Sequence, residues 1–386
     1  MGCLINAASA AVELLRSLRL CSLLFLTDRL YARLKAALTV RAGMKDMVDR
    51  RMAHRFLPLA FTLVFGALFP LSATQATASE KEHIVPVRID VGGYKLNSVL
   101  VEPGKSADLP PILFIHGASA SLYDPMYSFL TKLRGRAQLL FVDRPGHGNS
   151  DIGGKGNILP DGQADAIALL MKKRGIPRAI VVGHSFGGAI AAALAVRHPD
   201  MVTGLVFLSP AVYPWEGGIA WYYTAANAPF TGPLFSTFIA PPAGLLALDQ
   251  ATRGVFAPNS RPADYVEATH AVAALRPKAF RHNAQEVAAL NEWARGASSD
   301  YRRIKAPTVI ITGDTDTIVS PEVHSRHLAR DIRGSTLIVV HNLGHKSDYV
   351  ANDLAIAAIE KVAGRPSDLK AAQRAVERRI ENDRGS

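Results

Sequence analysis

The stretch VVGHSFGGAIAAALA, residues 181–195, places one serine among three glycines, after a short apolar run and before an alanine-rich one. The apolar run predicts a buried strand, and the alanine-rich run predicts a helix. Gly183 and Gly187 flank Ser185 at the spacing G-x-S-x-G. Small residues at these positions permit a sharp strand-to-helix turn that presents a nucleophile. The simpler interpretation is a helix N-cap, a position that serine often occupies.

Short apolar runs alternate with helical patterns along most of the chain after residue 80. A hairpin signal surrounds Gly92 and Gly93, and six further runs predict strands, at 110–117, 137–148, 179–185, 204–210, 307–314 and 335–342. Helices are predicted at 124–134, 160–174, 186–198, 321–332 and 348–363. This alternation predicts an α/β fold with an eight-stranded, mostly parallel sheet and helices on both faces.

One long interval interrupts this alternation. Residues 79–210 and 301–365 form the predicted core, whereas 211–300 contain no convincing strand and are rich in alanine and aromatic residues. A bare loop of this length is uncommon, so we expect a helical cap inserted in the core. Its Trp215 and Trp221 are candidate substrate-binding residues, although such rings can equally pack the cap on the core. Residues 366–386 predict a charged C-terminal helix or tail.

A serine nucleophile needs a base, and His345 is the preferred candidate. It lies in VVHNLGHKSDYV, after the last predicted strand and just before a helix, where a loop can bring its imidazole to Ser185. His341 competes with it but continues the strand, which favours a structural role. His184 is adjacent to the serine, but its side chain is expected to point away, because neighbouring residues of a strand alternate in direction.

The base in turn needs a carboxylate that fixes its tautomer and stabilises its charged form. The segment ITGDTDTIVSP follows the strand before His345 and offers Asp314 and Asp316. Asp316 lies deeper in the loop and is preferred, with Asp314 expected to hold the turn. Asp143, in DRPGHG, is an outside candidate with an expected structural role.

Two backbone N–H groups are expected to form an oxyanion hole. The N–H of Phe186 directly follows the nucleophile, and the N–H of Ala118 lies in the loop after the first parallel strand. In that loop His116 and Gly117 are further candidate substrate-binding positions, although a structural role that braces the loop is favoured for His116. Removing one donor of such a site typically lowers the reaction rate by about 10²–10³-fold.

Composition excludes several classes of protein. The 386-residue chain is 48% hydrophobic and 20% charged, which excludes a disordered chain. Ten of the 44 Lys and Arg residues but only four of the 33 acidic ones lie in residues 1–78, and no basic stripe with interleaved aromatic residues follows. We therefore expect no nucleic-acid partner. Both cysteines, Cys3 and Cys21, precede the predicted core, which excludes a thiol nucleophile or a cysteine-based metal site there.

The N-terminal segment resembles a targeting sequence more than part of the fold. Basic residues at 50–55, an apolar run at 56–71 and Ala76-Thr77-Ala78 follow the order of a secretory signal, so 44–78 is predicted to be a signal peptide. The alternatives are an uncleaved anchor that associates the protein with a membrane, or a buried or amphipathic segment. Residues 1–43 form an extension of doubtful status. The protein is therefore expected to be exported, either periplasmic or secreted, or anchored and facing outward.

Together these motifs resemble the α/β-hydrolase superfamily. The resemblance rests on His116-Gly117, DRPGHGNS at 143–150, the 183–187 elbow, Asp316 and His345, in order from about residue 83 to 363. It is closest to the cap-bearing branch, which includes esterases, perhydrolases, carbon–carbon bond hydrolases, epoxide hydrolases and haloalkane dehalogenases. The last two use an aspartate nucleophile, so Ser185 argues against them. Phe186 stands where carbon–carbon hydrolases often carry methionine.

The resemblance implies a serine hydrolase that acts on a small, lipophilic carboxylic ester through Ser185, His345 and Asp316. It implies a small-molecule substrate and no metal or organic cofactor. Carbon–carbon bond hydrolysis, lactone opening and perhydrolysis would use the same three residues. A catalytically silent binding protein on the same fold is the alternative from another class, and such proteins tend to lose the catalytic residues that are intact here.

Overall fold

The computed structural model describes residues 84–383. The predicted N-terminal extension, residues 1–43, and the predicted signal peptide, residues 44–78, lie outside the described residues. All strands and helices below therefore belong to the part of the chain that follows them.

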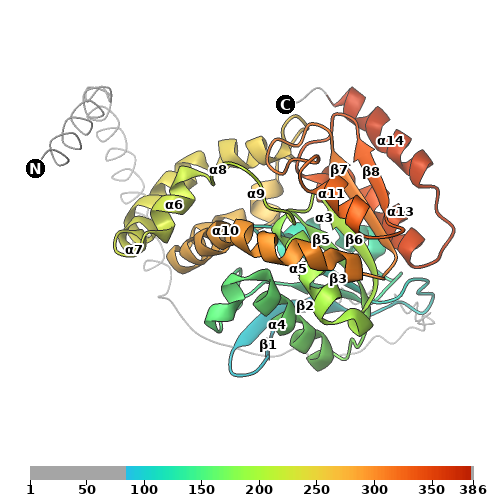
Figure 1. Ribbon diagram of the computed structural model, residues 1–386, viewed down its shortest axis with the longest axis horizontal. Coiled ribbons are helices and arrows are strands. Elements are labelled where there is room, and N and C mark those ends of the chain that lie inside the picture. Colours follow the sequence, from blue (N-terminus) through green and yellow to red (C-terminus); the bar gives the residue numbers. More distant parts are fainter. Residues whose placement is uncertain (1–83, 384–386) are drawn as a thin grey trace, which may run out of the picture. The chain divides into compact units, whose positions relative to one another are not determined.

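Eight strands form one sheet in the order β1-β2-β4-β3-β5-β6-β7-β8, as Figure 1 shows. β1 pairs antiparallel with β2, and β2 pairs antiparallel with β4, whereas all the other neighbours are parallel. The predicted eight-stranded, mostly parallel sheet is confirmed. The strands are β1 Val87–Asp90, β2 Lys95–Val101, β3 Ile112–Ile115, β4 Leu139–Val142, β5 Ala179–His184, β6 Val202–Leu208, β7 Thr308–Gly313 and β8 Thr336–Val340.

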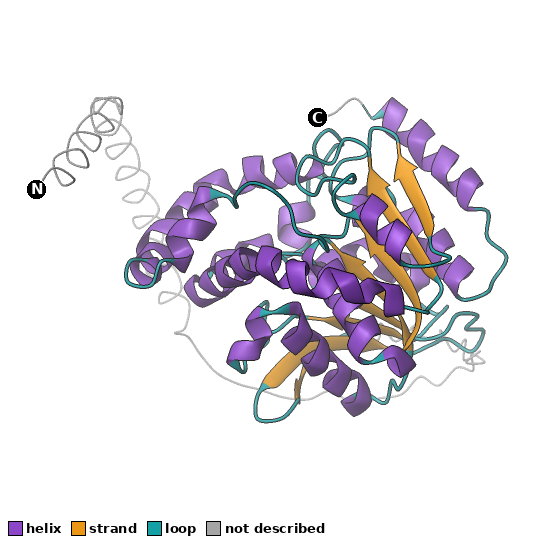
Figure 2. Ribbon diagram, in the orientation of Figure 1, coloured by secondary structure: helices purple, strands orange, loops and turns teal. Residues whose placement is uncertain are grey.

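Helices cover both faces of this sheet, as Figure 2 shows. In β3, Leu113 and Ile115 join one apolar core, and Ile112 and Phe114 join the other, because successive side chains of a strand point to opposite faces. The first core includes residues of α4, α5 and α11, and the second includes residues of α3, α13 and α14. The helices of the core are α3 Tyr123–Leu133, α4 Pro160–Lys173, α5 Phe186–Arg197, α11 Ser325–Asp331, α12 Ser347–Val350, α13 Asn352–Val362 and α14 Leu369–Asn382, with short turns η1 Lys155–Ile158 and η2 Pro199–Met201.

A helical insertion separates β6 from β7. Between residues 211 and 300, all of which the structure describes, every regular element is helical. The elements are α6 Trp221–Asn227, α7 Gly232–Leu234, the π-helical turn η3 Phe235–Ile239, α8 Ala240–Phe256, α9 Tyr265–Ala268, η4 Ala271–Leu275, α10 Pro277–Ala297 and η5 Ser298–Arg303. Helix α10 returns the chain to the core, where Leu290, Trp293 and Ala294 are buried.

Candidate active site

Ser185 occupies a strained turn between β5 and α5. Its φ of 53° and ψ of −119° are unusual for a residue with a side chain, and the hydroxyl makes no capping hydrogen bond to the helix. Ser185 therefore occupies the N-cap position of α5, but its side chain does not cap the helix. Glycines make the turn sterically possible, because a Cβ on Gly187 would lie 2.2 Å from the Ile115 carbonyl oxygen. A Cβ on Gly183 would lie 2.5 Å from the Gly187 carbonyl oxygen. The residues predicted for the elbow thus hold Ser185 in a conformation that its own side chain does not stabilise.

His345 and Asp316 form a buried pair. Nδ1 of His345 lies 2.8 Å from Oδ2 of Asp316, and both side chains are almost fully buried. Burial raises the pKa of Asp316, but hydrogen bonds from His345 and from the N–H groups of Val319 and Ile318 outweigh it and leave the pKa below its ordinary value. The carboxylate therefore stays charged and can hold Nδ1 of His345 protonated, which leaves Nε2 to accept a proton.

The loop that carries His345 docks on the elbow through His184. Nε2 of His184 donates to the His345 carbonyl at 3.0 Å, and the two rings lie 4.9 Å apart between centroids. Since His184 directly precedes Ser185, this contact holds the loop of His345 against the elbow. The Ser185 hydroxyl itself makes no hydrogen bond to another residue of the described chain. Such contacts are often long in sites without substrate and shorten in the reactive complex.

The loop of His345 is also fixed from the cap. The N–H of Gly344 donates to Asn259 Oδ1 at 2.8 Å, and Asn259 Nδ2 donates to the Asn342 carbonyl at 2.8 Å. Gly344 does not have a left-handed φ, so turning freedom does not explain the glycine at this position. The reason is a close approach, because a Cβ there would lie 2.1 Å from the Ala257 carbonyl oxygen.

The competing candidates have other partners. His341 and Asp314 pair with each other at 2.7 Å at the surface, with the His341 side chain 66% exposed. Asp143 is buried and accepts hydrogen bonds from the N–H groups of Leu122 and Asn149 and from the side chain of Asn97. These contacts agree with the structural roles that the sequence favoured for all three side chains.

The loop after β3 approaches Ser185 closely. A Cβ on Gly117 would lie 3.1 Å from Cβ of Ser185, so only glycine fits comfortably at this position. The Gly117 carbonyl accepts hydrogen bonds from His116 Nδ1 at 2.8 Å and from Arg144 Nη2 at 3.1 Å. The N–H of Ala118 belongs to the same planar peptide unit and must point the opposite way. His116 and Arg144 therefore fix the direction of one predicted oxyanion donor.

The second predicted donor, the N–H of Phe186, begins helix α5. The first N–H groups of a helix have no acceptor within it, and the helix dipole makes this end favourable for negative charge. The ring of Phe186 is buried and lies 4.5 Å from the guanidinium carbon of Arg144. The same arginine thus contacts both segments that carry the predicted donors.

Sequence reasoning missed Arg144 and the cluster that neutralises it. Arg144 is fully buried, and its Nη1 lies 3.2 Å from Oε2 of Glu286 on α10. Glu286 also lies 2.7 Å from His147 and accepts from Gln163. Burial raises the pKa of Glu286, but Arg144 and His147 lower it far more, so the carboxylate is charged. Burial and Arg144 lower the pKa of His147 to about 4.

His116 has no ring nitrogen left for a substrate. Its Nδ1 donates to Gly117, and its Nε2 accepts from the N–H of Arg144 at 3.1 Å. Burial, together with the charge of Arg144, lowers its pKa well below the usual range, so the ring is neutral. The bracing role that the sequence favoured fits these contacts, and the substrate-binding role does not.

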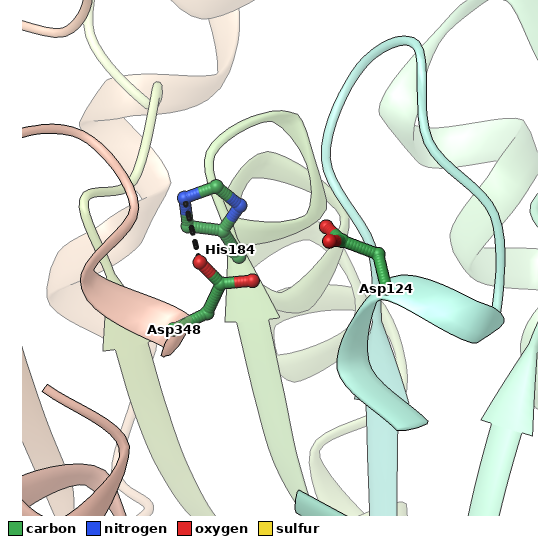
Figure 3. A group of neighbouring side chains, drawn as sticks. All are labelled: Asp124, His184 and Asp348. Carbon is green, nitrogen blue, oxygen red and sulfur yellow. Dashed lines mark ion pairs between the residues drawn. The ribbon is translucent and has the colours of Figure 1, made fainter. Parts of the chain in front are cut away.

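A second buried cluster lies on the other side of the elbow. Figure 3 shows Asp124, His184 and Asp348 facing one another, a set that could hold a metal ion by residue type. Nζ of Lys346 lies 2.9 Å from both oxygens of Asp124 and 2.9 Å from Oδ2 of Asp348. The hydroxyl of Tyr265 on α9 also donates to Asp124 at 2.7 Å. The Lys346 ammonium therefore supplies the positive charge that these two carboxylates need.

The electrostatics of this cluster keep His184 neutral. Burial lowers its pKa well below the usual range, and the nearby charge of Lys346 lowers it further. Burial acts to lower the pKa of Lys346, but Asp124 and Asp348 raise it well above its ordinary value. A permanent ammonium next to His345 thus joins the loop of the base to α3 and, through Tyr265, to the cap.

Replacing Lys346 with methionine is expected to lower the free energy of unfolding by about 3–5 kcal/mol, because two buried carboxylates would lose their counter-ion. Urea unfolding monitored by circular dichroism measures this loss. Lys361→Met removes an exposed lysine and should change stability by less than about 0.5 kcal/mol. A loss below about 1 kcal/mol for Lys346→Met would show that Asp124 and Asp348 do not depend on this cation. Adding Asp348→Asn should recover part of the loss.

The two cap tryptophans occupy different surroundings. Trp215 exchanges backbone hydrogen bonds with the Asn291 side chain on α10, and its ring lies 6.0 Å from that of His324. Trp221 is 73% exposed, and its ring packs edge-on against Tyr222 and Phe235 of the cap. Of this pair, therefore, only Trp215 is anchored near the loops of the site.

Acidification is expected to destabilise the fold through His324. Its Nδ1 accepts from the N–H groups of Val212 and Tyr213, and burial lowers its pKa to about 4. At pH values between the pKa of an unfolded histidine, near 6.5, and the lower pKa of His324 in the fold, the unfolded chain binds the proton more readily than the folded protein does. The free energy of unfolding should therefore fall by about 1–3 kcal/mol from this group as the pH falls from 7.5 to 4.5.

Urea unfolding at pH 7.5 and 4.5 tests this expectation. His324→Gln should show a smaller difference between the two pH values than the unchanged protein, because its side chain does not titrate. His341→Gln is the matched control, since His341 is exposed. An equal pH dependence in the unchanged protein and His324→Gln would rule out this source of acid sensitivity.

Comparisons with known proteins agree with this architecture. The family described as alpha/beta hydrolase fold matches residues 110–347. The 2-(acetamidomethylene)succinate hydrolase of Mesorhizobium japonicum is 28% identical over 288 residues, which cover 72% of this chain and 95% of that protein.

Two solved structures show the same fold at lower identity. The structure of E-2-(acetamidomethylene)succinate hydrolase superposes with a TM-score of 0.57 at 23% identity and covers 73% of this chain and 100% of its own. The structure of the enol-lactonase from Burkholderia xenovorans LB400 also superposes with a TM-score of 0.57, at 20% identity. The match covers 72% of this chain and 100% of the enol-lactonase chain. At these identities the two likenesses concern the fold alone.

Proposed function

The chain belongs to the alpha/beta hydrolase fold family and is a hydrolase, and we propose that it is a serine hydrolase of small, uncharged carboxylic esters. One observation carries the proposal. Ser185 lies on a strained elbow, the adjacent His184 holds the loop of His345, and His345 pairs with Asp316 at 2.8 Å. A nucleophile, a base and an orienting carboxylate in this arrangement match the requirements of acyl transfer.

In the proposed reaction, Ser185 Oγ attacks the ester carbonyl while His345 Nε2 takes its proton. Asp316 holds Nδ1–H of His345 and stabilises the imidazolium. The N–H groups of Ala118 and Phe186 bind the oxyanion. His345 then gives its proton to the departing alcohol, which leaves an acyl group on Ser185. Water, activated by His345 in the same way, releases the acid.

The charges around the site favour an uncharged substrate. Arg144 is neutralised by Glu286, and Lys346 is neutralised by Asp124 and Asp348. Neither cation is therefore free to bind a substrate carboxylate. The relative from M. japonicum is named for a succinate, which carries two carboxylates. These neutralised cations are the reason to propose a different substrate class for this chain.

We also propose that the protein is exported. The support is the order of basic residues, apolar run and small residues in 44–78. Sequencing the N-terminus of protein produced in its natural host tests this, with a mature start after Ala78 expected. A start at Met1 would contradict export by cleavage.

Turnover of matched esters tests the proposed activity. 4-Nitrophenyl butyrate should be hydrolysed at least about tenfold faster, in kcat/KM, than 4-nitrophenyl hemisuccinate, because neither Arg144 nor Lys346 is free to pair with the acyl-chain carboxylate of the second ester. A fluorophosphonate should label Ser185 and abolish this turnover. Equal turnover of the two esters would contradict the uncharged substrate. Absence of both labelling and turnover would instead favour a silent binding protein.

A further inference from the structure

Part of the cap is free of charge over an unusual length. Residues 217–248, here the cap arm, contain no Asp, Glu, Lys, Arg or His, and they lie between Glu216 and Asp249. The arm includes α6, α7, η3 and the first half of α8. In Figure 1, α6 and α7 lie at the end of the domain farthest from β7 and β8. An uncharged segment of this length in a folded domain is ordinarily buried in a core.

The cap arm is not buried. In the 17-residue helix α8 only Ala240 and Phe256 are fully buried, and in α6 only Ala226 is. Phe230 is 91% exposed and Leu246 is 90% exposed. The exposed large apolar residues of the arm are Trp221, Tyr222, Phe230, Leu234, Phe238, Ile239, Leu245 and Leu246. A concentration of this kind marks an interaction surface, in contrast to scattered single residues.

The arm is shaped to lie in an interface instead of crossing a bilayer. In the described part of the chain, no single helix is long and apolar enough to span a membrane. The segments Trp221–Asn227 and Gly232–Phe256 meet that test of length and composition only together, and they are bent by 117°. A bent apolar segment with exposed aromatic side chains suits the boundary between headgroups and acyl chains.

Two hydroxyl groups of the arm and two cations near it fit a lipid surface. Thr237 donates to the Pro233 carbonyl within the arm, and the Tyr223 hydroxyl pairs with Ser119 of the core, so neither needs an outside partner. Leu275 packs against Gly244 of the arm, and the exposed cations Arg276 and Lys278 follow it directly. Cations at the edge of an apolar surface complement anionic headgroups.

The sequence outside the described residues adds to this argument. Residues 56–79 carry no charged side chain, and this run ends just before the described domain begins at residue 84. Whether it is a signal or an anchor, such a run directs a chain to a membrane. A second copy of the chain would instead need a polar rim around the contact. The uncharged arm offers few groups for such a rim.

We propose that the cap arm docks on the surface of a lipid bilayer, with Phe230, Trp221 and Leu246 inserted among the acyl chains. The arm thereby holds the domain at the bilayer by its own apolar surface. This inference concerns the place where the chain works, and it stands apart from the proposed reaction.

Tryptophan fluorescence of the full chain can test the docking. The three tryptophans are Trp215, Trp221 and Trp293, so none lies in residues 1–83 and the signal reports on the cap. Vesicles of phosphatidylethanolamine and phosphatidylglycerol, with bromine on the acyl chains, should quench the emission and shift the remainder to shorter wavelength. Trp221→Phe should remove this quenching. Quenching that persists in Trp221→Phe, or no quenching in the unchanged chain, would overturn the proposal.

A charged variant and a matched control identify the surface. The double variant Phe230→Glu/Leu246→Glu should raise the lipid concentration needed for half-maximal quenching at least about tenfold. Leu169→Glu, which charges an exposed leucine of α4, should leave it unchanged. Hydrolysis of soluble 4-nitrophenyl butyrate should persist in both variants, which separates loss of docking from loss of folding or activity. Lipid docking would be contradicted if the lipid dependence of the double variant were unchanged. It would also be contradicted if the unchanged chain formed a dimer that the double substitution dissociates, while vesicles quenched neither protein.

Discussion

Replacing Ser185 with alanine is expected to lower kcat for 4-nitrophenyl butyrate by about 10⁴–10⁶-fold, because the acyl-enzyme route is lost entirely. The oxyanion donors and the binding surface would remain and should retain a small rate above that of water. KM should change little, since the hydroxyl contributes to bond formation more than to binding. Steady-state kinetics with active-site titration of the unchanged enzyme measures both constants.

Stability provides the control for this variant. The Ser185 hydroxyl does not cap helix α5, so its removal takes no hydrogen bond from the fold. Urea unfolding should therefore show a change of less than about 1 kcal/mol, and the strained φ of 53° should persist because neighbouring backbone imposes it. Ser299→Ala, at an exposed position, should keep full activity. If Ser185→Ala retained a tenth of the activity or more, another residue would have to be the nucleophile.

Local patterns predicted the sheet and the elbow because their causes are local. The G-x-S-x-G spacing reflects a steric requirement, because a Cβ on Gly187 would lie only 2.2 Å from the Ile115 carbonyl oxygen. Short apolar runs indicate burial on both faces of a sheet, which the fully buried strands β3, β4, β5 and β7 confirm. The pairing of His345 with Asp316 followed from their position after consecutive strands of a parallel sheet.

The buried charge clusters could not be predicted in the same way. Arg144 and Glu286 are 142 residues apart, and Lys346 and Asp124 are 222 residues apart. No periodicity links such positions, because each pair forms only after the cap and the loops have packed. Lys346 resembled any loop lysine in the sequence. A cation directly after the proposed base, in a loop between a strand and a helix, was the only available signal.

The cap shows the same limit of local patterns. Its helical character was predictable from the absence of strand patterns over residues 211–300. The sequence did not predict which apolar faces of the cap pack and which remain exposed. The reason is that α8 is also apolar on sides that contact nothing in the described domain. The rings of Trp215 and Trp221 looked equivalent in the sequence, and only the packing on α10 distinguishes them.

Replacing Asp316 with asparagine is expected to lower kcat by about 10⁴-fold at neutral pH, because an amide can hold His345 in the wrong tautomer and cannot stabilise the imidazolium. The amide has nearly the shape of the carboxylate, so the hydrogen bonds from Ile318 and Val319 should survive. Asp314→Asn is the matched control, because Asp314 pairs with the exposed His341. It should alter kcat by less than about twofold, and an equal loss in the two variants would contradict the assignment of Asp316.

The pH dependence of stability gives the Asp316 prediction an independent measurement. Since the pKa of Asp316 lies below its ordinary value in the fold, its charge stabilises the folded state above the pKa of the unfolded carboxyl. That contribution disappears as the pH falls through the lower folded value. Asp316→Asn should therefore be less stable than the unchanged protein at pH 7, and the difference should shrink towards pH 3. A difference that is constant over this range would mean that the Asp316 carboxylate gains nothing from His345 and the two backbone donors.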